Sequence, residues 1–131
     1  MDFDLKIGMK KEEAVMVSDE NTAIAMGSGS LPVFATPALA ALLEKAAAIL
    51  VEDQVSSEWT SVGTLLAIEH IAATPVGMLV TGKVELMEVQ GRKLIFSVQA
   101  FDGREEIGRG THERFLVKKE SFMQKAMNKI G

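Results

Sequence analysis

The sequence predicts an α+β fold in which a curved antiparallel sheet wraps around one long helix. Residues 36–50 carry apolar side chains at helical spacing and are apolar on almost every side. Four later segments alternate between apolar and polar residues and are separated by turn residues. A helix without a polar face has to be covered on most sides, and a curved sheet can cover it.

The predicted helix begins at Thr36-Pro37, because threonine can cap the free amides and proline is favoured at the first helical position. Its main apolar stripe consists of Leu39, Leu42, Leu43, Ala46 and Leu50. Glu44 stands on the flank of this stripe. The residues three and four positions away from it are all alanine, so Glu44 has no partner for a helical ion pair.

The strands follow from period-two alternation and from the turns between them. A short first strand is expected over 12–17, then four strands over 62–69, 78–89, 93–101 and 105–118, and a terminal helix over 121–130. Gln90-Gly91 and Asp102-Gly103 predict hairpins, the second with a two-residue turn. The residues expected to face the helix are Val80, Val84 and Leu86 in one strand, and Leu94, Phe96, Val98 and Ala100 in the next.

Residues 18–31 are predicted to be irregular, with Met26–Ser30 as the most flexible part. Three Gly or Ser residues in a row after Gly27 suit a mobile loop over a site. They suit an ordinary surface loop equally well, so the pattern leaves both interpretations open.

Composition bounds the class of protein. A length of 131 residues with 47% hydrophobic residues predicts a single domain, 1–131, with a core of its own. The absence of cysteine excludes disulfides, thiol nucleophiles and cysteine-ligated zinc. A net charge of -4 gives no reason to expect nucleic acid or an anionic membrane as partner. No apolar run suggests a membrane span and the N-terminus does not look like a signal peptide, so a cytoplasmic location is expected.

Three segments carry a resemblance to a known family. They are Val-Phe-Ala-Thr at 33–36, Glu-His-Ile-Ala-Ala-Thr-Pro-Val-Gly at 69–77, and the stretch from Asp102-Gly103 through Glu-Ile-Gly-Arg-Gly-Thr-His-Glu-Arg at 106–114. Together they resemble the hotdog-fold thioesterases related to fluoroacetyl-CoA thioesterase, over about residues 31–122. The resemblance implies a hotdog fold and hydrolysis of an acyl-CoA. It also implies a homodimer, with coenzyme A near the subunit interface.

The resemblance also implies the site residues. The catalytic group falls on Thr36, Glu44 and His70, and the backbone amide near Gly63 falls where the family contacts the thioester carbonyl. Phe34 and Arg114 are the other expected substrate-binding residues. Coenzyme A is part of the substrate, so no separate cofactor is expected. Neither His70 nor His112 has metal-ligand spacing with a second strong ligand, so no metal is predicted.

Each of these residues also has a purely structural interpretation. Glu44 could be a solvated glutamate beside Lys45, His70 a histidine bonded to backbone, and Thr36 a helix cap. In the catalytic interpretation, Glu44 is the nucleophile or general base and His70 shuttles a proton. Thr36 would then orient Glu44 or attack the thioester itself.

Other polar residues are assigned less directly. His112 and Arg114 alternate along the last strand and share one face, which for His112 we expect to be a polar face of the sheet. Lys118 and Lys119 could contact the phosphates of the nucleotide or be ordinary charged residues at a strand end. Gly108 and Gly110 are expected to permit strand curvature.

The expected substrate is a short or medium acyl-CoA. The fluoroacetyl-CoA enzyme carries aromatic residues before its catalytic threonine, whereas residues 25–31 here contain none, and Pro37 replaces a glycine. These departures predict thioester hydrolysis without fluoroacetyl selectivity. A non-catalytic acyl-CoA sensor on the same fold is the alternative function. A hotdog hydratase would need an aspartate followed by Asn-Pro and His, and the sequence has no such run.

Overall fold

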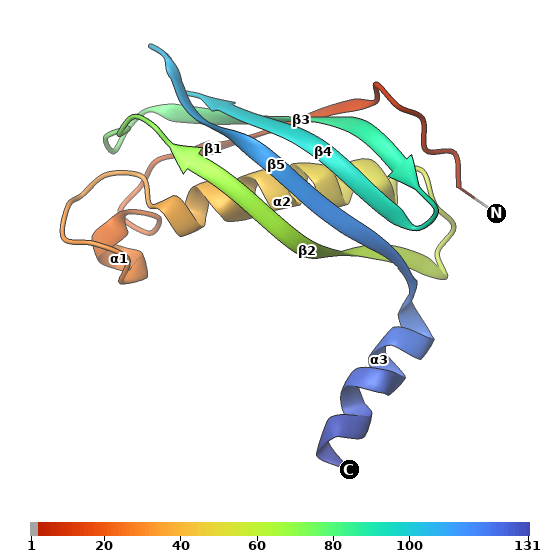
Figure 1. The fold of residues 1–131 in the computed structure, drawn as a ribbon. Coiled ribbons are helices and arrows are strands. Elements are labelled where there is room, and N and C mark those ends of the chain that lie inside the picture. The colour runs from red at the N-terminus through yellow and green to blue at the C-terminus, as the bar shows by residue number, and fades with distance from the viewer. Residues whose placement is uncertain (1–2) are drawn as a thin grey trace.

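The computed structural model describes residues 3–131, and Figure 1 shows one curled sheet with a long helix against it. The elements follow in the order β1 (Lys10–Met16), α1 (Ala23–Met26), α2 (Thr36–Glu52), β2 (Trp59–His70), β3 (Leu79–Gln90), β4 (Lys93–Phe101), β5 (Glu106–Lys118), α3 (Lys119–Met127) and a 3₁₀ turn η1 (Asn128–Ile130). All strand pairs are antiparallel, and the order in the sheet is β1-β3-β4-β5-β2. The predicted α+β plan is confirmed.

The core lies between α2 and the concave face of the sheet. Every residue of the predicted helical stripe is buried, and so are the residues predicted to face the helix from β3 and β4. Gly108 lies close to the helix: a Cβ added there would come within 2.9 Å of Leu39 Cδ2. At Gly110 the backbone of β2 is even closer, because an added Cβ would lie 2.0 Å from the carbonyl oxygen of Ala67. These two glycines therefore allow close packing of helix and strands where the sheet curls.

A bulge interrupts the pairing of β2 with β5. Gly63 lies opposite Arg114 and Leu65 lies opposite Glu113, which leaves Thr64 as the extra residue of β2. The Thr64 hydroxyl donates to the Glu113 carbonyl at 3.2 Å. The bulge therefore lies at the middle of β2, beside the side chains that form the polar half of the site described below.

Four details differ from the sequence prediction. The N-cap of α2 is Ala35, and Thr36 is already helical and does not cap the helix. Residues 18–31, predicted to be irregular, contain α1, which is capped by Thr22 and ends at Gly27 with φ 69°. The turn after β4 is longer than two residues, because Asp102 Oδ1 accepts from the amides of Arg104 and Glu105. The terminal helix starts at Lys119 and projects away from the sheet (Figure 1), and none of its residues is buried.

Candidate active site

Thr36 and His70 meet at the N-terminal end of α2. The backbone just before the helix is fixed by amide-to-carbonyl bonds from Phe34 to Thr74 at 2.9 Å and from Ala35 to Asn21 at 2.9 Å. His70 is the last residue of β2, and its Nδ1 lies 2.8 Å from Thr36 Oγ1. Since Thr36 does not cap the helix, its hydroxyl is free to form this contact. A hydroxyl and an imidazole at this distance have the geometry of a nucleophile and its base.

The environment of His70 favours the neutral imidazole. Burial lowers the pKa of His70 below its ordinary value of 6.5. Its other nitrogen, Nε2, is buried and has no hydrogen-bond partner among residues 3–131. When Nε2 carries the proton, Nδ1 has a lone pair and the Thr36 hydroxyl donates to it. In that tautomer His70 can take the proton of Thr36.

A cavity of about 300 Å³ opens at this pair. Its walls come from α1 and the loop after it, from the start of α2, and from the turn that follows β2. The lining residues are Ala23, Ser28, Val33, Phe34, Thr36, His70, Ile71, Ala72 and Ala73. Three predicted site residues, Phe34, Thr36 and His70, therefore share one cavity. Ser28, from the Gly/Ser segment that suited either a loop over a site or an ordinary surface loop, forms part of its wall.

Glu44 lies in a different environment, further along α2. Its side chain is 45% exposed, and Oε2 lies 3.9 Å from Arg114 Nη1. The same oxygen lies against Gly63 of β2, where an added Cβ would come within 2.8 Å of it. Lys45 pairs with Glu13 at 3.5 Å, so it does not neutralise Glu44. Of the predicted residues, the structure thus groups Glu44 with Gly63 and Arg114.

The two groups are separated along the helix axis. Glu44 follows Thr36 by eight residues, which corresponds to about 12 Å of rise. The Glu44 carboxylate lies beside Gly63 and Arg114. Within one protomer the predicted catalytic residues therefore form two groups, and only Thr36 and His70 are in direct contact.

Behind Glu44 lies a buried polar network that the sequence did not predict. Arg114 donates from Nε to Ser61 Oγ at 2.7 Å and from Nη2 to the Ser61 carbonyl at 2.9 Å. Its Nη1 lies 3.2 Å from His112 Nε2, and His112 Nδ1 lies 2.8 Å from the Leu65 carbonyl. The expectation that His112 lies on a polar face of the sheet is wrong. His112 is 1% exposed, because it lies on the inward face of β5 together with Arg114 and Leu116.

Ser61 and His112 are the polar residues of this group that sequence reasoning missed or misplaced. The alternation of β5 did place His112 and Arg114 on one face, but their polarity suggested solvent. A signal was present, since Leu116, the next residue on the same face of β5, is apolar and buried. Only the register with β2 reveals Ser61, which lies 53 residues before Arg114 in the chain.

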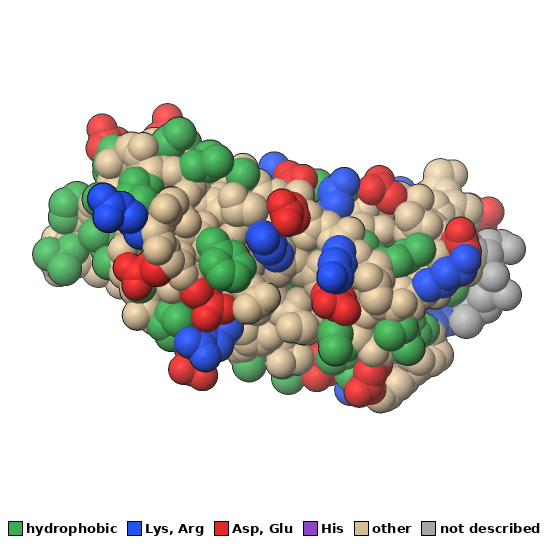
Figure 2. Space-filling view, turned by 90° about the horizontal axis from the view of Figure 1, so that it is seen from above, with side chains coloured by type: hydrophobic (Ala, Val, Ile, Leu, Met, Phe, Trp, Pro, Cys, Tyr) green, Lys and Arg blue, Asp and Glu red, His purple; other side chains and the backbone are tan. Residues whose placement is uncertain are grey.

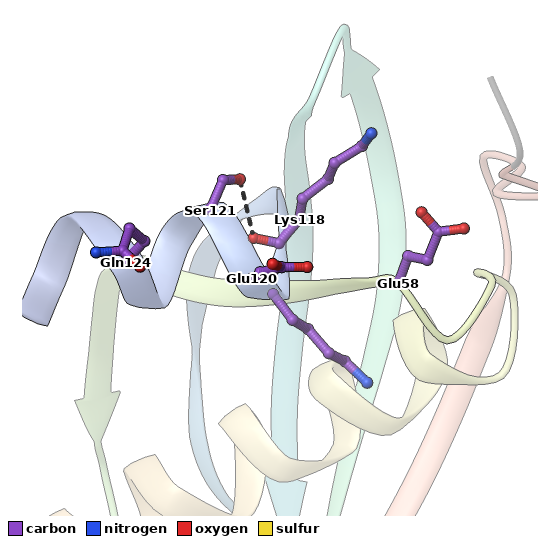
Figure 3. Close-up of a pocket in the computed structure, with 6 residues that line it drawn as sticks. Glu58, Lys118, Glu120, Ser121 and Gln124 are labelled. Carbon is purple, nitrogen blue, oxygen red and sulfur yellow. Dashed lines mark hydrogen bonds between the residues drawn. The ribbon is translucent and has the colours of Figure 1, made fainter.

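A larger cavity, of about 550 Å³, lies at the base of α3 (Figure 3). It is lined by Glu58, Lys118, Lys119, Glu120, Ser121 and Gln124, a mixture of both charges. This cavity is at the Trp59 end of β2, whereas His70 is at the other end. Twelve strand residues span roughly 35 Å, so this cavity is remote from Thr36 within the protomer.

The face of the molecule seen from above shows no focus of one charge. Figure 2 shows acidic, basic and apolar side chains interspersed over the face seen from above. Across residues 3–131, no three His, Asp or Glu side chains are grouped as metal ligands would be. In the same part of the chain, no helix is both long and apolar enough to cross a membrane.

Comparisons with known proteins point to one family. The profile of the fluoroacetyl-CoA-specific thioesterase family matches residues 17–120. The fluoroacetyl-CoA thioesterase of Streptantibioticus cattleyicolor is 41% identical over 97 residues, which are 74% of this chain and 70% of that protein. A variant of fluoroacetyl-CoA thioesterase solved with acetyl-CoA is 32% identical, with a TM-score of 0.90 over 97% of this chain and 100% of the other.

A more distant structure shows the fold alone. The hot-dog-like protein from Thermanaerovibrio acidaminovorans is 20% identical, with a TM-score of 0.87 over 95% of this chain and 93% of that one. The curled sheet around a single long helix is therefore the hotdog fold, as predicted. Within that fold, the chain belongs to the fluoroacetyl-CoA-specific thioesterase family. The predicted family is thus confirmed, and with it the class of enzyme, the thioester hydrolases.

Proposed function

We propose that this chain hydrolyses a short or medium acyl-CoA to the free acid and coenzyme A at the Thr36–His70 pair. The observation that carries the proposal is the 2.8 Å contact between Thr36 Oγ1 and His70 Nδ1 at the mouth of a cavity. A volume of about 300 Å³ is at the small end for ligand cavities, which favours a short acyl group.

The first half of the reaction uses these two residues. His70 accepts the Thr36 proton as the hydroxyl oxygen bonds to the thioester carbonyl carbon. The carbon–sulfur bond then breaks, and the departing thiolate takes the proton from His70 and leaves as free coenzyme A. Thr36 lies in the first turn of α2, where helix amides and dipole stabilise developing negative charge. The products of this half are an acyl-Thr36 ester and coenzyme A.

The second half uses the carboxylate. We assign Glu44 the role of general base: it takes a proton from the water that attacks the acyl carbon, and Thr36 leaves as its hydroxyl while the free acid is released. Since Glu44 and Thr36 lie about 12 Å apart along α2 within a protomer, this role needs the dimer described below to bring the two groups together. Arg114 Nη1 lies 3.9 Å from Glu44 Oε2, so the carboxylate has a cationic neighbour on its inner side. In the same dimer the backbone at Gly63, beside Glu44, is the proposed contact for the carbonyl oxygen, with Phe34 and Arg114 contacting the substrate. No separate cofactor or metal takes part in this scheme.

We further propose that the chain works as a homodimer joined through β2. One edge of β2 pairs with β5, and among residues 3–131 no strand pairs with the other edge. Long free strand edges are normally covered, and a second copy of β2 is a matching cover. An antiparallel pair about a twofold axis would bring the Trp59 end of one β2 to the His70 end of the other. The partner's α3 base would then lie near the Thr36 cavity.

The test is release of free thiol from a panel of acyl-CoAs, from acetyl and haloacetyl to long chains, by wild type and by Glu44→Ala. The proposal predicts catalytic turnover of short or medium chains by wild type. It also predicts that turnover collapses in Glu44→Ala while the protein stays folded. Binding of acyl-CoA without turnover across the panel would contradict the proposal and favour a sensor.

A further inference from the structure

The guanidinium of Arg114 is buried and makes three hydrogen bonds, and the proposed reaction leaves these surroundings unexplained. Arg114 is 6% exposed, and it donates to both Ser61 oxygens and to His112. A buried cation is costly unless its donors are satisfied and a negative charge is near. The nearest carboxylate is Glu44, at 3.9 Å and 45% exposed. The network therefore holds a cation at the inner side of Glu44.

The contacts of His112 determine its protonation state. A carbonyl can only accept, so Nδ1 of His112 carries a proton and donates to Leu65 O at 2.8 Å. A guanidinium can only donate, so Nε2 of His112 carries a lone pair and accepts from Arg114 Nη1 at 3.2 Å. His112 is therefore the neutral Nδ1–H tautomer. Burial, reinforced by the charge of Arg114, lowers its pKa and keeps it neutral, against the smaller opposing effects of the Leu65 bond, Glu44 and Glu113.

We propose that His112 is a positioning residue for the reaction: as a fixed acceptor it orients Arg114, and through Arg114 it holds the Glu44 carboxylate beside Gly63. Three distances support this chain of contacts. A Cβ added at Gly63 would lie 2.8 Å from Glu44 Oε2, 3.3 Å from His112 Cε1 and 3.4 Å from Arg114 Nη1. The three side chains thus converge on one glycine, at the bulge in the middle of β2. The inference rests on the proposed function of Glu44.

If the residue at position 112 served packing alone, an apolar side chain would suffice, and the surroundings of His112 are apolar enough to hold one. Its ring stacks on Phe96 at a centroid distance of 6.2 Å, and it lies on the same strand face as Leu116. Replacement by leucine would keep much of the packing but leave Arg114 Nη1 and Leu65 O without their partner. Replacement by glutamine would keep both bonds, since one amide offers a donor and an acceptor about as far apart as the two ring nitrogens.

The test is a double-mutant cycle on kcat/KM of thiol release, with His112→Leu, Arg114→Met and the double variant. If His112 acts through Arg114, His112→Leu lowers kcat, with KM changing less, by roughly tenfold or more in the wild-type background. It has almost no effect in the Arg114→Met background. His112→Gln restores most of the loss. Val98→Ala, in the same core but remote from Arg114, lowers thermal stability without this fall in kcat.

Additive losses in the cycle, or a Gln variant as impaired as Leu, would overturn the proposal. A second measurement needs no substitution: the chain has two histidines, so nitrogen chemical shifts of the imidazoles can be assigned to His70 and His112. The Nδ1–H tautomer of His112 is expected throughout the neutral pH range, and the Nε2–H tautomer or an imidazolium there would also overturn it. Absence of turnover by wild type would instead count against the proposed function.

Discussion

Thr36 Oγ1 lies 2.8 Å from His70 Nδ1, although 34 residues separate them in the chain. One belongs to the first turn of α2 and the other ends the edge strand β2. The contact replaces a helix cap, because Ala35 occupies the cap position without a side-chain bond. The Thr36 hydroxyl therefore contacts a neutral base and does not cap the helix.

An acyl ester should form on Thr36 during turnover. In Glu44→Gln the attacking groups are intact but the base for the hydrolytic water is lost, so the ester should accumulate. Intact-mass spectrometry after mixing with acetyl-CoA is expected to show a protein heavier by one acetyl group. Thr36→Val should show none. Turnover by Thr36→Val with no adduct in either variant would mean that water attacks the thioester directly.

The rate should depend on the neutral form of His70. Burial lowers the pKa of His70 below 6.5, so more than half of the base is neutral at that pH and the neutral fraction rises further as pH increases. We expect kcat/KM to be constant at alkaline pH and to fall along an acid limb centred below pH 6.5. Rapid thiol-release measurements from pH 4.5 to 8 would test this. An acid limb centred above 6.5 would show that another group, or a differently placed His70, controls the rate.

Gly63→Ala should impair catalysis more than folding. The new Cβ would come within 2.8 Å of Glu44 Oε2, and a half-exposed carboxylate can move away at little cost in stability. We expect kcat to fall by about tenfold or more, with a small change in melting temperature. Gly103→Ala is the matched control, since its nearest neighbour is Met78 Cε at 3.5 Å. Wild-type kcat in Gly63→Ala would place Glu44 outside the reaction.

A dimer through β2 should be sensitive to charge on that strand. Leu65 on β2 is 46% exposed and Met87 on β3 is 45% exposed, so they form a matched pair. Leu65→Lys is expected to raise the dimer dissociation constant at least tenfold, about 1.4 kcal/mol, and Met87→Lys to leave it unchanged. Sedimentation equilibrium would measure both. Equal behaviour of the two variants, or a monomeric wild type, would argue against this interface.

Much of the fold follows from local patterns. The residues of β3 and β4 that alternation predicted to face the helix are all buried, because one face of each strand packs on α2. The residues of the predicted leucine stripe of α2 are buried for the same reason. The two-residue turn predicted at Asp102-Gly103 was wrong. Asp102 begins a longer loop, since its carboxylate accepts from two amides that a two-residue turn would not present.

The site was harder to predict because it depends on contacts between distant segments. The pattern around Thr36 is that of a helix cap, and only the position of His70 shows why the hydroxyl points elsewhere. His112 looked like a surface residue because its partners, Leu65 and Arg114, lie on a neighbouring strand and two residues along its own. Strand register decides which residues share a polar network. The pattern of a single segment carries no information about that register.

The most direct test of the Thr36–His70 account compares thiol release from a short acyl-CoA by wild type, Thr36→Val, His70→Asn and the double variant. The account predicts that each single variant loses roughly 10²–10⁴ in kcat. The double variant should lose little more, because the two residues act as one unit. Folded single variants that keep wild-type turnover would contradict it, and the reaction would have to be sought elsewhere in the chain.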